Sequence, residues 1–111
     1  MPKNYTLIVN VPVTDAEAVR KAIGDAGGGK AGNYSHCSFS TRGMGRFKGN
    51  ENSNPTIGEP GEYEAVEEER IEVAHISEEV IGDVIAAMEK AHPYEETAYQ
   101  LIELANVIKP M

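Results

Sequence analysis

The chain turns from helix to strand at His92-Pro93, and this corner limits the possible folds more than any other stretch. Before it, apolar residues recur at three- and four-residue spacing, with Val84 and Met88 on one face of a predicted helix. Proline has no backbone N–H and biases the preceding residue away from helical geometry, so the helix should end near His92. From Tyr94 onwards, β-forming and apolar side chains predict the last strand.

The corner also carries an imidazole, a phenol and two carboxyl groups, from His92, Tyr94, Glu95 and Glu96. One interpretation is a polar staple that fixes where the last strand docks, because such a corner must satisfy backbone groups freed at the helix end. The other interpretation is a divalent metal site for copper or zinc, with His92 and Glu95 or Glu96 as ligands. His36 is a further candidate ligand, provided that the second strand lies near the corner.

The first helix is predicted between two strands. Residues 5–11 are rich in apolar and β-branched side chains that alternate between two faces, which indicates a strand. Thr14 and Glu17 have the spacing of a capping box, so we expect a helix to begin there. The glycines at 27–29 should end it, because glycine accepts the left-handed conformation common just past a helix.

Residues 33–42 predict the second strand. On it, Cys37 and Phe39 share one face, where we interpret the thiol as a small buried apolar group. His36 should lie on the opposite face, so only one of these two neighbours can join a given cluster. Catalysis by Cys37 has little support, because no nearby residue supplies an orienting acid on its face.

Residues 43–62 are rich in glycine, proline and asparagine and predict a long irregular loop. Such a loop is unusual in a small domain and is often functional. Its start carries a local cluster of cations in an otherwise acidic chain. One hypothesis is a site for a small anion or nucleotide; the alternative is that the cations only pair with glutamates of the next strand. The candidate ligand-binding residues are Arg42, Gly43, Gly45, Arg46 and Lys48.

The remaining segments complete a recognisable order. Residues 63–76 predict a third strand with an acidic, solvated start, and residues 77–91 predict a second helix. Strand, helix, strand, strand, helix, strand is the split βαβ, ferredoxin-like arrangement. The predicted class is therefore α+β, with two helices on one face of a four-stranded antiparallel sheet.

The length of 111 residues predicts a single domain with a modest core, residues 1–111. The first and last strands carry apolar groups on both faces, as Ile8 beside Leu7 and Ile102 beside Leu101 indicate. A sheet that is apolar on both faces needs a second cover. The economical cover is another copy of the same chain.

The composition excludes several classes of partner. A net charge of -8 argues against non-specific nucleic-acid binding, which depends on neutralising phosphates. No apolar run is long enough for a membrane span, and the N-terminus lacks the features of a signal peptide. The single cysteine excludes an internal disulfide and fits a reducing cytoplasm.

Five sequence blocks in the same order resemble a known family: GNYSHCSF (32–39), GMGRF (43–47), NPTIG (54–58), VEEERIE (66–72) and AHPYEE (91–96). Together they are similar to the insert domain of the YqfO-type proteins, the NGG-one-interacting factor three family. The His92-Pro93-Tyr94-Glu95 segment also looks like the C-terminal signature of CutA proteins. Those are small ferredoxin-like proteins that form tight trimers and are related in fold to PII signalling proteins.

The resemblance implies a stand-alone version of the insert that forms a homotrimer. It also implies a binding or regulatory module rather than an enzyme, with a small anionic ligand between subunits near the 43–62 loop. Full-length relatives carry a separate domain whose histidines and acids resemble a two-metal hydrolase centre; this chain lacks it, so no hydrolase role carries over. The alternative function is binding of copper or zinc at the corner.

Overall fold

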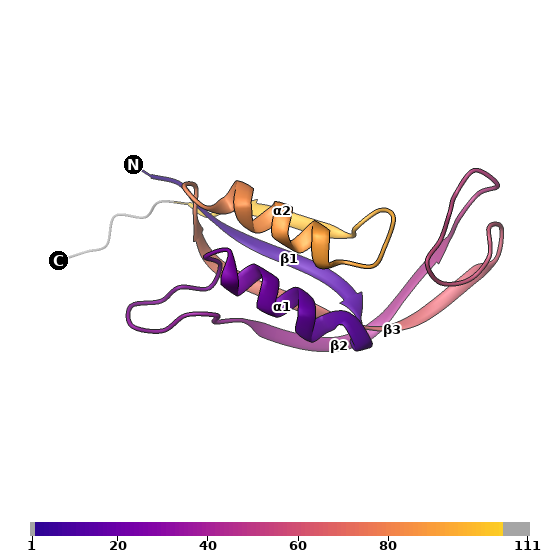
Figure 1. Ribbon diagram of the computed structural model, residues 1–111, viewed down its shortest axis with the longest axis horizontal. Helices are drawn as coiled ribbons and strands as arrows, with labels where there is room; N and C mark the ends of the chain where they lie inside the picture. The colour runs from indigo at the N-terminus through magenta and orange to yellow at the C-terminus, as the bar shows by residue number, and fades with distance from the viewer. Residues whose placement is uncertain (1, 106–111) are drawn as a thin grey trace.

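The computed structural model describes residues 2–105. Its elements are β1 (Asn4–Pro12), a short 3₁₀ helix η1 (Val13–Asp15), α1 (Ala16–Asp25), β2 (Phe39–Lys48), β3 (Tyr63–Ser77), α2 (Ile81–Ala91) and β4 (Tyr99–Glu103). The two α-helices pack on one face of a four-stranded antiparallel sheet of order β2-β3-β1-β4 (Figure 1). This arrangement confirms the predicted α+β, ferredoxin-like class. Within residues 2–105, no helix has both the length and the apolar character needed to cross a membrane.

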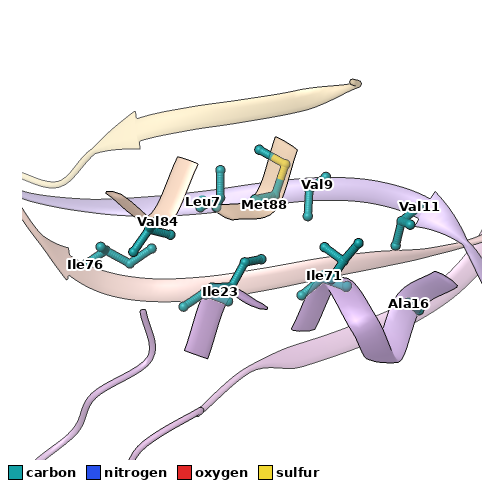
Figure 2. Close-up of a cluster of buried hydrophobic side chains, with 11 residues drawn as sticks. Leu7, Val9, Val11, Ala16, Ile23, Ile71, Ile76, Val84 and Met88 are labelled. Atoms are coloured by element: carbon teal, nitrogen blue, oxygen red, sulfur yellow. The ribbon is translucent and has the colours of Figure 1, made fainter. Parts of the chain in front are cut away.

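The core lies between the sheet and the two helices (Figure 2). Alternation along β1 turns Leu7, Val9 and Val11 towards the helices, and all three are buried. Ile23 of α1 and Met88 of α2 meet them from the other side, as the helical spacing of apolar residues predicts. Each such side chain contributes roughly 1.5–3 kcal/mol through its removal from water. The other core residues are Ala16, Val19, Ile71, Val73, Ile76 and Val84.

The helix-to-strand corner has the predicted form at its start. α2 ends next to His92, whose backbone is extended with φ -78° and ψ 136°. The last strand begins later than predicted, at Tyr99 and not at Tyr94. The intervening residues bend past the end of β1, where the Asn10 N–H donates to the Ala98 carbonyl at 3.1 Å.

The second strand lies further along the chain than the sequence pattern predicts. It covers Phe39–Lys48, whereas the pattern predicts residues 33–42. The irregular loop that follows therefore spans residues 49–62 and not the predicted 43–62.

Glycines caused this error in the strand boundary. Gly43 and Gly45 resemble loop residues because glycine is depleted in strands. In the structure they pair with Glu68 and Val66 of β3. β3 is 15 residues long, so it supplies backbone partners well beyond the region covered by the helices. Pairing with a neighbouring strand therefore overrides the low strand propensity of the two glycines.

Residues 30–38 do not join the sheet, so the prediction of a buried thiol is wrong. Cys37 is exposed, and Phe39 is 65% exposed. The Cys37 N–H donates to the Gly29 carbonyl at 2.9 Å, which holds this segment next to the end of α1. His36 has a left-handed backbone with φ 59°, which interrupts the alternation of a strand.

The predicted capping box is also absent. Thr14 lies in η1, where its hydroxyl donates to Asp15 Oδ2 at 3.2 Å. Because a 3₁₀ turn follows β1, the α-helix begins only at Ala16. Glu17 consequently lies in the first turn of the helix and pairs with Arg20 at 3.0 Å.

The β2–β3 ribbon extends past the helices as an arm (Figure 1). The molecule is accordingly elongated, with extents of 56 × 23 × 23 Å. At the end of the arm, loop 49–62 contacts the corner that follows α2. The arm and the corner therefore enclose a space outside the main core.

Candidate functional site

A hollow of ≈ 320 Å³ lies between the corner and the end of the β2–β3 arm. Its volume falls near the lower end of the range for small-molecule pockets. Phe47 of β2 and Tyr94 of the corner form an aromatic wall, with ring centres 5.9 Å apart and planes tilted by 58°. Further lining residues are Gly45, Arg46, Lys48, Glu68, Glu95 and Glu96.

His92 is 6% exposed and ties the corner to β1. Its Nε2–H donates to the Asn10 carbonyl at 2.7 Å, and its Nδ1 accepts the Tyr94 N–H at 3.2 Å. These partners fix the tautomer, because a carbonyl only accepts and an amide N–H only donates. Both ring nitrogens therefore have partners within the protein, as the polar-staple interpretation predicts.

Loop 49–62 is attached to the same corner by two hydrogen bonds. The Asn54 N–H donates to Glu95 Oε2 at 3.2 Å, and the Thr56 hydroxyl donates to the Pro93 carbonyl at 2.6 Å. These contacts close one side of the hollow. Glu96 is exposed and lies at its rim.

Tyr94 lies between two rings and binds a carboxyl group. Its ring centre is 5.0 Å from that of His92 and 5.9 Å from that of Phe47. Its hydroxyl donates to Glu68 Oε2 at 2.8 Å. Burial of the phenol and its hydrogen bond to Glu68 raise the pKa of Tyr94 above its ordinary value. The phenol therefore remains a hydrogen-bond donor under ordinary conditions.

Glu68 lines the hollow and is 8% exposed. A Cβ added to Gly45 would overlap Glu68 Oε1, so the glycine leaves room for this carboxyl group beside β2. A second hollow of ≈ 230 Å³ adjoins the first and shares Asn10, Gly45 and Glu68 with it. Arg42 and Gly43, two of the predicted ligand-binding residues, line this second hollow.

The predicted ligand-binding cations lie in different surroundings. Arg42 donates to Glu67 of β3 at 3.2 Å, as the ion-pair alternative predicts. Arg46 and Lys48 line the first hollow together with Gly45. Neither cation forms an ion pair with any residue in the range 2–105.

The four predicted metal ligands are not brought together. His36 belongs to the segment between α1 and β2, which lies at the other end of the helices from the corner (Figure 1). Its Nε2 is 2.9 Å from Asp25 Oδ1. Of the other three, His92 uses both nitrogens internally, which leaves Glu95 and Glu96. In the part of the chain that the structure describes, no group of three or more His, Cys, Asp or Glu could hold a metal ion.

Sequence reasoning missed Glu68 and Phe47 as parts of the site. Glu68 lies in a run of glutamates that looks like a solvated strand edge, and only the strand register places it behind the corner. A signal was present, because Gly43, Gly45 and Phe47 alternate along the chain. If the three residues are assigned to a strand, they lie on one face of it. On that face, two positions without a side chain precede an aromatic ring, which indicates room for a neighbouring group.

Comparison with known proteins identifies longer relatives. No family model matches the chain. The GTP cyclohydrolase 1 type 2 homolog of Halalkalibacterium halodurans is 51% identical over 102 residues, which are 92% of this chain and 27% of that protein. The homolog of Bacillus subtilis is 50% identical over 95 residues, 86% of this chain and 25% of that protein. The chain thus spans about a quarter of the length of these curated relatives.

Solved structures also include a longer relative, and others share the fold of this chain. A Bacillus cereus protein related to NIF3 superposes with a TM-score of 0.77 and 48% identity, over 95% of this chain and 26% of that one. The periplasmic divalent cation tolerance protein CutA from Archaeoglobus fulgidus gives a TM-score of 0.63 at 18% identity, over 96% of this chain and 88% of that one. The GlnK–ATP complex of B. subtilis gives a TM-score of 0.60 at 13% identity, over 96% of this chain and 87% of that one. The chain is therefore a homologue of the insert domain of the GTP cyclohydrolase 1 type 2 homologs, the NIF3 family, and shares its ferredoxin-like fold with CutA and GlnK.

Proposed function

We propose that the chain is a non-enzymatic binding module that assembles as a homotrimer and takes a small anionic ligand in the hollow beside the corner. The observation that supports this function is the pair of cations at the hollow. Arg46 and Lys48 line it without an ion-pair partner in residues 2–105, although the chain has a net charge of -8. Arg42, by contrast, pairs with Glu67 of β3.

The overall negative charge does not prevent local anion binding. Exposed charges separated by more than roughly 8 Å are largely screened at physiological salt. Alternation along β2 puts Arg46 and Lys48 on the face opposite Phe47, and β2 is an edge strand. Their side chains therefore leave β2 on the side away from Phe47, and an anion would meet them at the free edge of the sheet, next to the hollow that both residues line.

The trimer is supported by the face of the sheet that the helices leave open. The strand register puts Phe39, Ile8 and Ile102 on this face. Phe39 is 65% exposed and Ile102 is 44% exposed. A second copy of the chain would cover such a face, and a closed cyclic assembly would do so in every subunit. Sedimentation equilibrium at micromolar concentration should return three times the chain mass; a clean monomer would refute the assembly.

Titration with phenyl phosphate, followed by two-dimensional NMR, tests the binding function. We expect shifts centred on the hollow in the unmutated protein and loss of binding in Arg46→Glu. Arg42→Glu is the matched control, because Arg42 lies outside the first hollow and already pairs with Glu67. Equal loss in both variants would indicate a general charge effect and would contradict a site at Arg46.

Binding of copper or zinc is the second candidate, with Glu95 and Glu96 as the ligands that remain accessible. It has less geometric support, because both nitrogens of His92 already have protein partners. A thermal-shift series with each metal separates the two functions, since a ligand of the folded state raises its stability by mass action. Stabilisation by metal that Glu95→Gln abolishes would favour the metal function over the anion function.

A further inference from the structure

One oxygen of Glu68 has no protein partner although the side chain is almost completely buried. Glu68 is 8% exposed, and its Oε2 accepts the Tyr94 hydroxyl. No hydrogen bond in residues 2–105 reaches Oε1. The same part of the chain contains no side-chain oxygen or nitrogen that is both fully buried and unpartnered. Oε1 must therefore reach the space of the hollow, which Glu68 lines.

The surroundings of Oε1 favour a specific kind of partner. A carboxyl oxygen that faces a hollow and has no protein donor can accept a hydrogen bond from a ligand that brings an N–H or O–H group. Beside it, Phe47 and Tyr94 offer ring surfaces that suit a flat apolar body. Arg46 and Lys48, which carry the proposed anion site, line the same hollow.

Gly45 indicates that this position of the carboxyl group is built into the strand. Any side chain at Gly45 would overlap Glu68 Oε1. Gly43, two residues earlier on the same face of β2, has open space around it and shows no such constraint. The close approach to the Glu68 carboxyl group is therefore local to Gly45, where a larger residue would displace that group.

We propose that Glu68 Oε1 accepts a hydrogen bond from an amino group on the planar ring of a ligand whose acidic group meets Arg46 and Lys48. The ligand class is an aminated aromatic or heteroaromatic compound that carries a phosphate or carboxylate. This inference rests on the proposed anion-binding function. It adds the Glu68 carboxyl group as the residue that would favour one anionic ligand over another. Because Oε2 is occupied by Tyr94, one donor is expected at Glu68 rather than a two-pronged contact.

Two probes that differ in one group test the proposal directly. 4-Aminophenyl phosphate and phenyl phosphate share the ring and the anion, and only the first carries the amino donor. In NMR titrations of the full chain, we expect 4-aminophenyl phosphate to bind about tenfold more tightly, since hydrogen bonds to charged groups contribute enough for that factor. Glu68→Gln should reduce this preference, because it replaces a charged acceptor by a neutral amide.

Tyr94→Phe is the control for a purely structural role of Glu68. It removes the hydroxyl bonded to Oε2 and leaves Oε1 in place, so it should lower stability but keep the preference for the amino probe. Equal affinity of the two probes for the unmutated protein would overturn the role of Glu68 while leaving the anion function intact. An unchanged preference in Glu68→Gln would overturn it as well. Absence of binding by both probes would overturn both proposals together.

Discussion

Replacing His92 by alanine should destabilise the protein strongly without any metal present. The imidazole is 6% exposed and makes two hydrogen bonds, one to the Asn10 carbonyl and one from the Tyr94 N–H. Alanine would leave both backbone groups without a partner. It would also remove the ring contact with Tyr94, whose ring centre is 5.0 Å away.

The size of the effect follows from these contacts. An unsatisfied buried group costs about 1–3 kcal/mol, and the lower end applies here because Asn10 and Tyr94 are only half-buried. The lost ring contact adds roughly 0.5–1.5 kcal/mol. The expected fall in the free energy of unfolding is therefore about 3 kcal/mol. In a domain of this size, that corresponds to a drop in Tm of about 10 °C.

Urea unfolding in buffer with a chelator, at one fixed protein concentration, measures this change. We expect a lower midpoint with an unchanged slope, which signifies lost stability rather than altered compactness. His75→Asn is the matched control, because His75 is exposed and its left-handed backbone tolerates asparagine. The staple reasoning is refuted if His92→Ala unfolds at the same midpoint as the unmutated protein, or if the difference arises only when copper or zinc is added.

Two further substitutions test neighbouring details. Gly45→Ala should lower the free energy of unfolding by about 1 kcal/mol, because its Cβ would displace the Glu68 carboxyl group from the Tyr94 hydroxyl. Gly43→Ala meets open space and should be nearly neutral, so equal effects in urea unfolding would contradict the close approach. The hydrogen bond from Lys21, and then that from His36, hold the pKa of Asp25 below its ordinary value. Lys21→Met should therefore raise the pKa of Asp25 in an NMR titration, and an unchanged pKa would refute the pairing. Because that pKa is depressed, its stabilisation is present above the unfolded-state pKa and is lost as pH falls through the folded-state pKa, a loss that Lys21→Met should diminish.

The sequence predicts the order of elements and the core because both depend on local periodicity. Leu7, Val9 and Val11 alternate along β1, and Val84 and Met88 recur along α2, so their buried faces are visible without coordinates. The end of α2 at the corner is equally local, since Pro93 determines it. These predictions needed no knowledge of which strands are neighbours.

The candidate site depends on pairings that are distant in sequence, which explains why it was only partly predicted. Residues 43–48 look like a loop until the long partner strand β3 supplies their hydrogen bonds. The same pairing moves Glu68 from a solvated run of glutamates to a position behind Tyr94. Arg46 and Lys48 were predicted from their charge alone, but the aromatic wall required the corner and the arm to meet. His36 was misjudged because its left-handed backbone places it outside the second strand.

The most direct test of the binding function is amide hydrogen exchange of the unmutated protein with and without saturating phenyl phosphate. Ligand binding in the hollow should slow exchange in two separate segments, residues 45–56 of the arm and residues 94–98 of the corner, because both line it. Core strand β1 away from Asn10 serves as the internal reference and should not change. Slower exchange confined to these two segments is the predicted result. Unchanged exchange in both segments, with this and other phosphate compounds, would contradict the proposed site and leave the arm-to-corner contacts with a structural role only.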